Sequence, residues 1–104
     1  MASQSFQFVM RTGPNPGKVF EVSKSEIYIG RDINNDIVIN DPKVSGFHAR
    51  IDRVPEGFVL VDLNSRNGSF VNGSRIKQRT LETGDKLRLG AASLAYKVDY
   101  TSST

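Results

Sequence analysis

Three short polar segments of this 104-residue chain carry groups suited to binding an anion. They are Gly30 to Asp32, Val44 to His48 and Asn64 to Ser69, and each adjoins an apolar run. Arginine offers a planar fork that matches phosphate oxygens, and serine offers a short hydroxyl donor. Glycine lets backbone N–H groups approach an anion closely. These residue types predict recognition of a tetrahedral oxyanion if the fold brings the segments together, which spacing alone does not decide.

The apolar residues alternate along the chain in a way that predicts strands. Phe6, Phe8 and Met10 share one side of the first predicted strand, and Ile27 and Ile29 share one side of a later one. No window holds a helical apolar stripe for three turns. Turn pairs such as Asn-Gly divide the runs, so the pattern predicts an all-β sandwich or barrel. Other predicted strands include 19–22, 37–39, 47–52, 58–63, 87–89 and 94–98, with 58–63 apolar enough to be buried on both faces.

Length and composition indicate one domain, residues 1–104, with a core at about 6–99 and a flexible polar tail at 100–104. Apolar residues make up 38% of the chain, enough for a packed interior. Cysteine is absent, and no stretch approaches the roughly 20 apolar residues that span a bilayer. The start of the chain lacks the regions of a signal peptide. We expect a cytoplasmic protein, or the cytoplasmic module of a longer one, without membrane contact.

The charge balance is mildly basic. The chain has 14 Lys and Arg against 11 Asp and Glu, a net charge of +3, which suits an ordinary surface and agrees with an acidic ligand. The predicted strands show no regular interleaving of basic and aromatic residues. We therefore expect no nucleic-acid binding.

The only histidine, His48, has no pattern around it that would make it catalytic. General-base catalysis would need a nucleophile and an orienting carboxylate, and no motif supplies them. A transition-metal site would need further Cys or His ligands, and the segment 32–43 lacks the glycine and the glutamate of a calcium loop. We expect a binding module rather than an enzyme, with no metal and no cofactor.

Four short motifs stand in order at the ends of predicted strands. They are Gly30-Arg31, Ser45-x-x-His48, Asn67-Gly68 and Asn72-Gly73. Their types and order resemble those of the forkhead-associated (FHA) domain, and the likeness runs from about residue 19 to residue 98. The resemblance implies a β-sandwich of two sheets with about eleven strands. It also implies that the motif loops gather at one end of the sandwich and hold phosphothreonine.

The same resemblance implies which groups hold the ligand. Arg31 pairs with the phosphate, Ser45 donates its hydroxyl, and Gly46 offers only its backbone N–H. Asn67 bonds the main chain of the ligand, and Arg66 touches the phosphate or an acidic ligand side chain. Local alternatives stay open: Arg31 bonds its own loop, Ser45 makes a turn bond, Arg66 is solvated, or Asn67 fills a left-handed turn position.

Structural supports and one specificity position complete the implied site. Gly30 and Gly68 support the loops through their backbone, and the ring of His48 bonds backbone and holds the recognition loop. Lys43 lies at the rim, where it either reads an acidic residue a few positions after the phosphothreonine or is a plain surface lysine.

The expected function is a phosphothreonine-dependent adaptor that binds a Ser/Thr kinase substrate. The alternative is a scaffold that assembles or self-associates without phosphate. Arg31 distinguishes the two, because a scaffold that works through a sheet face does not use it. The sequence favours a monomer and leaves open the partner, the kinase and the residues preferred beside the phosphothreonine.

Overall fold

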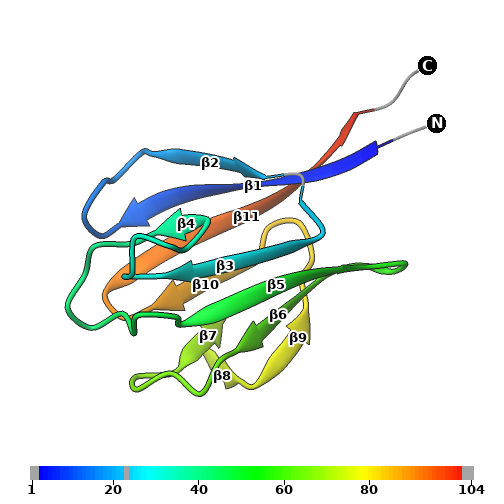
Figure 1. Cartoon of the computed structure of the whole chain (residues 1–104). Coiled ribbons are helices and arrows are strands. Elements are labelled where there is room, and N and C mark those ends of the chain that lie inside the picture. The colour runs from blue at the N-terminus through cyan, green and yellow to red at the C-terminus, as the bar shows by residue number, and fades with distance from the viewer. Residues whose placement is uncertain (1–2, 23, 102–104) are drawn as a thin grey trace.

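The computed structural model describes residues 3–22 and 24–101, and in this part of the chain eleven strands form two sheets (Figure 1). The strands are β1 Ser3–Thr12, β2 Val19–Val22, β3 Glu26–Gly30, β4 Ile37–Val38, β5 Ala49–Val54, β6 Gly57–Asp62, β7 Ser69–Val71, β8 Ser74–Ile76, β9 Gln78–Thr80, β10 Lys86–Leu89 and β11 Ala92–Thr101. The described residues include no helix, and hence none long and apolar enough to cross a membrane. The prediction of an all-β fold with about eleven strands is confirmed.

Two sheets make up the sandwich. The first has the strand order β2-β1-β11-β10-β7-β8, and the second has the order β4-β3-β5-β6-β9. All pairs are antiparallel except β3 with β4. The long pair of β1 with β11 sets Phe8 opposite Tyr96 and places the start of β1 and the end of β11 at one end of the sandwich (Figure 1). Loops that connect the strands occupy the opposite end (Figure 1).

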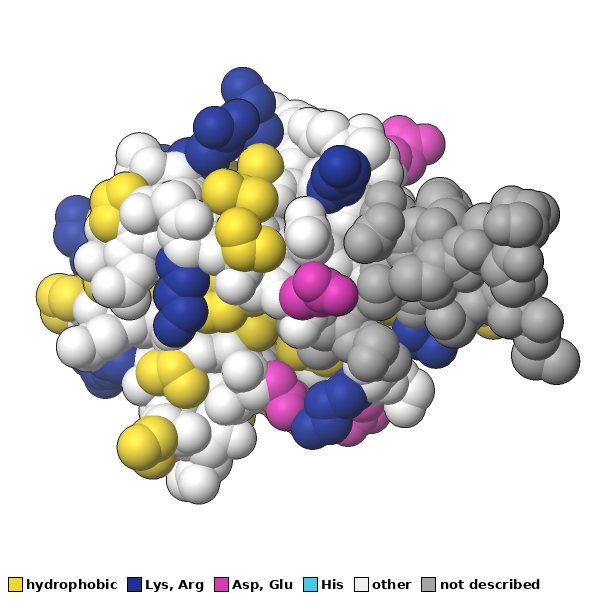
Figure 2. Space-filling view, turned by 90° about the horizontal axis from the view of Figure 1, so that it is seen from above, with side chains coloured by type: hydrophobic (Ala, Val, Ile, Leu, Met, Phe, Trp, Pro, Cys, Tyr) yellow, Lys and Arg dark blue, Asp and Glu magenta, His cyan; other side chains and the backbone are white. Residues whose placement is uncertain are grey.

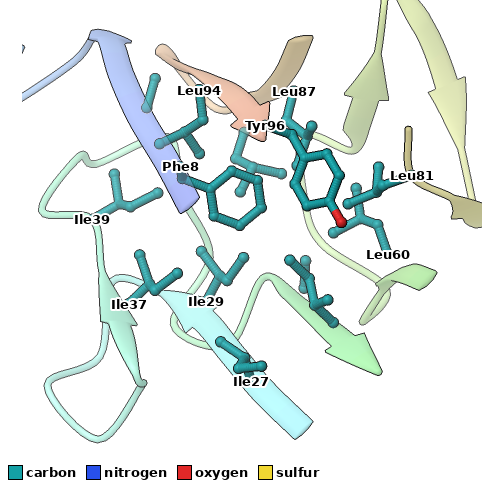
Figure 3. Packing of buried hydrophobic residues seen from close by; sticks show 14 of the residues in the cluster. Phe8, Ile27, Ile29, Ile37, Ile39, Leu60, Leu81, Leu87, Leu94 and Tyr96 are labelled. Atoms are coloured by element: carbon teal, nitrogen blue, oxygen red, sulfur yellow. The ribbon is translucent and has the colours of Figure 1, made fainter. Parts of the chain in front are cut away.

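The core fills the space between the sheets with the inward faces that the alternation predicted. Phe6, Phe8 and Met10 of β1 and Ile27 and Ile29 of β3 are buried, and side chains from both sheets point into the same space (Figure 3). Burying an aliphatic or aromatic side chain of this size contributes about 1.5–3 kcal/mol. The sandwich is therefore a packed frame on which the loops are mounted.

The alternation predicted for 47–52 begins only at Ala49, where β5 starts. Phe47 is 46% exposed, whereas His48 is fully buried. Both residues belong to the preceding loop, so the two-residue period of a strand does not apply to them. The ring of His48 turns inward because backbone groups there provide hydrogen-bond partners.

The prediction that 58–63 is buried on both faces is wrong. Phe58 and Leu60 are buried, but Val59 and Val61 are half-buried. Among the described residues, no further layer covers the outer face of this sheet. At the end of the chain, β11 runs to Thr101, and residues 102–104 of the predicted tail lie outside the described residues.

Candidate functional site

Three loops meet at the end of the sandwich opposite the start of β1 (Figure 1). We call them the apical loops: 31–36 between β3 and β4, 39–48 between β4 and β5, and 63–68 between β6 and β7. Each follows an apolar strand whose inward side chains are fixed in the core, so the frame sets where each loop begins. The convergence that the motifs require is therefore present in the fold.

Backbone hydrogen bonds join the first two apical loops. The N–H of Arg31 donates to the carbonyl of Ser45, and the N–H of Asp32 donates to the carbonyl of Gly46, both at 3.0 Å. The buried amide of Asn35 donates to the same Gly46 carbonyl at 2.7 Å. These bonds place Arg31 beside Ser45 although the two are far apart in the sequence.

Gly30 is needed for this close approach. A Cβ atom at this position would overlap the carbonyl oxygen of Gly46. Any other residue would therefore push the 39–48 loop away from the end of β3. The requirement for glycine at this position is steric and not conformational, since the φ angle of Gly30 lies outside the left-handed range.

His48 links the second and third apical loops. Its Nδ1 accepts a hydrogen bond from the backbone N–H of Ser45 at 3.1 Å, and its Nε2 lies 2.9 Å from the carbonyl oxygen of Gly68. Because a carbonyl only accepts, Nε2 carries the proton, which fixes the neutral tautomer. The ring is thus a buried cross-link between backbones.

The carboxylate of Asp62 organises the 63–68 loop. It accepts bonds from the hydroxyls of Ser65 and Ser69, both at 2.6 Å, and from the N–H of Ser65 at 3.1 Å. Burial by itself raises the pKa of this carboxyl, but the hydrogen bonds from both serines outweigh burial and lower the pKa. The Ser65 hydroxyl also accepts the N–H of Gly68, whose φ of +87° suits glycine.

Two more bonds fix the relative positions of the second and third loops. The backbone N–H of Arg66 donates to Oγ of Ser45 at 3.0 Å, and Nδ2 of Asn67 donates to the carbonyl of Lys43 at 2.7 Å. Among the described non-glycine residues, only Asn64 and Asn72 have a positive φ. The left-handed turn position considered for Asn67 is therefore wrong.

A pocket of about 270 Å³, here called the apical pocket, lies between these loops. Its described lining carries three cations and no carboxylate, and its residues are Arg31, Pro42, Lys43, Val44, Ser45, Gly46, Arg66 and Asn67. Arg31 makes one long bond, 3.4 Å to the carbonyl of Pro42, and forms no ion pair with Asp32. Its charge is therefore available to a ligand.

The distribution of surface charge agrees with an anionic ligand at this end. Figure 2 looks down on the edge of the sandwich formed by β2. The acidic side chains visible there lie in the middle and on the right, whereas Lys and Arg side chains also occur on the left, toward the apical loops. An anion that enters the apical pocket meets positive charge, because the lining holds three cations and no carboxylate.

The structure brings together all six residues predicted to contact a ligand, since Arg31, Lys43, Ser45, Gly46, Arg66 and Asn67 line one pocket. Sequence reasoning missed two lining residues, Pro42 and Val44, and three supports, Asn35, Asp41 and Asp62. Asp41 accepts the N–H groups of Lys43 and Ala91 and so ties the second loop to the β10–β11 turn. An aspartate two residues before the N–H that it binds is a turn signal that the sequence displays.

Comparisons with known proteins agree with this geometry. The model of the FHA domain family matches residues 27–90. The oxoglutarate dehydrogenase inhibitor of Corynebacterium efficiens is 36% identical over 89 residues, which cover 85% of this chain and 62% of that protein. The glycogen accumulation regulator GarA of Mycolicibacterium smegmatis is 31% identical over 96 residues, 92% of this chain and 61% of that protein. This chain spans about three fifths of the length of these relatives.

The fold has solved counterparts. A structure from a study of phosphothreonine-dependent FHA domain interactions superposes with a TM-score of 0.82 at 28% identity, over 89% of this chain and 95% of the other. The family model covers more than half of the chain, and the fold and the order of the motifs agree with it. This chain therefore belongs to the FHA domain family.

Proposed function

We propose that this domain binds phosphothreonine segments of other proteins in the apical pocket, with Arg31 as the main phosphate ligand. As an FHA domain, the chain is a phosphothreonine-dependent binding module and not an enzyme. The observation that carries the residue assignment is the lining of the pocket, which combines three cations with a hydroxyl and backbone N–H groups. A phosphothreonine carries close to two negative charges near neutral pH, so it is the ligand that this lining suits.

The phosphate is held by donors from all three apical loops. The guanidinium of Arg31 approaches from the first loop, and Ser45 and Gly46 approach from the second. Because Oγ of Ser45 accepts the N–H of Arg66, its own hydrogen is left to donate to a phosphate oxygen. Arg66 adds a second guanidinium from the third loop.

The rest of the bound segment meets the rim of the pocket. Nδ2 of Asn67 is bonded to the carbonyl of Lys43, which leaves Oδ1 of Asn67 to accept an N–H from the peptide main chain. Pro42 and Val44 give the pocket an apolar wall that suits the methyl group of threonine better than the bare methylene of serine. Lys43 lines the pocket, is exposed and forms no ion pair with another described residue, so its charge favours an acidic residue after the phosphothreonine.

The cellular setting follows from the same proposal. FHA domains bind phosphothreonine peptides of kinase substrates, and we expect the partner here to be such a substrate in the cytoplasm. The two relatives are described as an inhibitor and a regulator, which suits a regulatory role for the full-length protein. Nucleic acid and membranes are not needed as partners.

A second function, assembly without phosphate, has one observation in its favour. Ile33 is 85% exposed and Phe47 is 46% exposed, and both lie in the apical loops. Apolar side chains at this position can contact a folded protein surface without any phosphate.

A phosphothreonine peptide library screen tests the proposal and separates the two functions. We expect enrichment that depends on the phosphate and disappears with Arg31→Ala. Loss of one or two charge-assisted bonds should weaken binding by about 2–3 kcal/mol, or roughly 30- to 150-fold. If Arg31→Ala keeps full affinity while Phe47→Ala loses it, the phosphate-independent function is the correct one.

A further inference from the structure

A second pocket lies on the other side of the 63–68 loop. This lateral pocket has a volume of about 530 Å³ and is lined by Asp62, Asn64, Ser65, Arg75, Ile76 and Lys77. Ser65 lines the lateral pocket, and the next two residues, Arg66 and Asn67, line the apical pocket. A single loop therefore forms a wall of both pockets.

The lateral pocket is formed by the end of β6, the 63–68 loop, and the segment from β8 to Lys77. Ile76 of β8 pairs with Ser69 of β7, and the N–H of Asp62 at the end of β6 donates to the carbonyl of Lys77 at 2.8 Å. Figure 1 shows β7 and β8 beside this end of β6. The cations of the pocket therefore lie at the same end of the sandwich as the phosphate ligands.

The guanidinium of Arg75 is set against the binding loop itself. A Cβ atom at Gly68 would lie 2.7 Å from Nε and 3.0 Å from Cζ of Arg75. The guanidinium thus occupies the space that a side chain at Gly68 would fill. Since Gly68 also accepts the bond from His48, Arg75 packs on the residue that anchors the third loop.

Both cations of the lateral pocket are available to a ligand. In the described part of the chain, the side chains of Arg75 and Lys77 form no ion pair, and both residues are exposed. The only carboxylate in the lining, Asp62, is turned to the hydroxyls of Ser65 and Ser69 and to a backbone N–H. The lining therefore has a net positive charge with an arginine fork that matches carboxylate or phosphate oxygens.

We propose that Arg75 and Lys77 form a second anion subsite that binds another acidic group of the same phosphopeptide. This rests on the proposed function, because the phosphothreonine must first occupy the apical pocket. Gly68 lies two residues beyond Arg66, and two Cα steps span at most about 8 Å. An extended peptide advances about 3.3–3.6 Å per residue, so a distance of about 8 Å corresponds to roughly two to three residues from the phosphothreonine.

A peptide series in which one acidic group moves along the chain tests this subsite. Each peptide has one phosphothreonine in an alanine background, with a single glutamate placed at each position up to five residues before or after it. A parallel series has phosphoserine in place of glutamate, which separates a carboxylate from a second phosphate. Affinities are measured by fluorescence anisotropy with the wild type and with three variants: Arg75→Gln/Lys77→Gln, Lys43→Ala and Arg31→Ala.

The proposal predicts a short window of positions where the acidic group tightens binding through Arg75 and Lys77, in addition to any gain that depends on Lys43. We expect a gain of about three- to tenfold for glutamate and a larger gain for phosphoserine. Arg75→Gln/Lys77→Gln should abolish that gain and leave the affinity for the peptide without a second acidic group within about twofold. Glutamine keeps a planar amide against Gly68, and a thermal melt checks that the double variant is folded.

Three outcomes would overturn the proposal. In the first, no position yields a gain. In the second, every gain persists in Arg75→Gln/Lys77→Gln. In the third, the gain is lost only with Lys43→Ala, which assigns it to the rim of the apical pocket. If the phosphothreonine peptide binds in an Arg31-dependent manner in these cases, only the second subsite is wrong. If that peptide does not bind at all, both the subsite and the proposed function fail.

Discussion

Replacing His48 by alanine tests the central cross-link of the site. The ring is fully buried and makes two bonds, 3.1 Å from Ser45 N and 2.9 Å from the Gly68 carbonyl. Each bond contributes about 1 kcal/mol net, and a buried backbone group left without a partner costs about 1–3 kcal/mol. Water that enters the vacated space offsets part of this cost. We expect His48→Ala to lower the free energy of unfolding by about 2–4 kcal/mol.

Urea denaturation and thermal melts followed by circular dichroism measure this effect. For a domain of this size, a loss of about 2–4 kcal/mol lowers the Tm by roughly 10–25 °C. Two further variants separate the contributions of the two hydrogen bonds of the ring. The side-chain amide of asparagine reaches the position of Nδ1, and that of glutamine reaches the position of Nε2. His48→Asn should restore part of the bond from Ser45, and His48→Gln should restore part of the bond to Gly68.

A neighbouring substitution provides the control for this experiment. Phe47 lies in the same loop but is 46% exposed, and Phe47→Ala should change the free energy of unfolding by less than about 1 kcal/mol. A free energy of unfolding for His48→Ala within about 0.5 kcal/mol of the wild type would refute the cross-link. Equal losses for His48→Ala and Phe47→Ala would also refute it.

Three further predictions follow from other parts of the site. Gly30→Ala should destabilise the domain by about 1–3 kcal/mol, because the added Cβ would overlap the Gly46 carbonyl. Gly46→Ala is the control, since a Cβ there meets open space and should leave the urea denaturation curve unchanged. Equal effects of the two substitutions would contradict the close approach of Gly30 to Gly46. The pKa of Asp62 is lowered from 3.8 in the folded state, so its ionised form stabilises the domain above that pH and the contribution is lost as the pH falls through the folded-state pKa. Asp62→Asn should therefore cost more stability at pH 7 than at about pH 2–3, and a constant loss across the pH range in denaturation experiments would exclude this role. Lys43→Ala should remove about 0.2–1 kcal/mol of preference for an acidic residue after the phosphothreonine, and an unchanged library profile would show Lys43 to be a plain surface lysine.

The sequence predicted the strands well where one face is buried and the other is open. Phe6, Phe8 and Met10 keep the two-residue period and point into the core as expected. The strand alternation predicted for 47–52 failed at His48, because hydrogen bonds to two loops determine the orientation of its ring. It also failed at Val59 and Val61, since the hydrophobicity of a run does not say whether another layer covers it.

The site could be predicted only through the family resemblance. Arg31 follows β3 and Arg66 lies in the loop after β6, two strands of one sheet that are not neighbours, and no local sequence pattern relates the two arginines. The contacts that hold the loops, such as Asn67 to the Lys43 carbonyl and Asp41 to Ala91, join residues distant in sequence. Arg75 is close to Gly68 in sequence, but its position against Gly68 depends on the folding back of the β7–β8 hairpin.

A titration of one peptide in two forms tests the central claim most directly. The peptide with the sequence preferred in the library screen is prepared with threonine or phosphothreonine and titrated into the wild type and Arg31→Ala by calorimetry at physiological salt. We predict that the unphosphorylated peptide and the Arg31→Ala variant each lose at least about 30-fold in affinity. Equal affinity of the wild type for the two peptides would contradict the account.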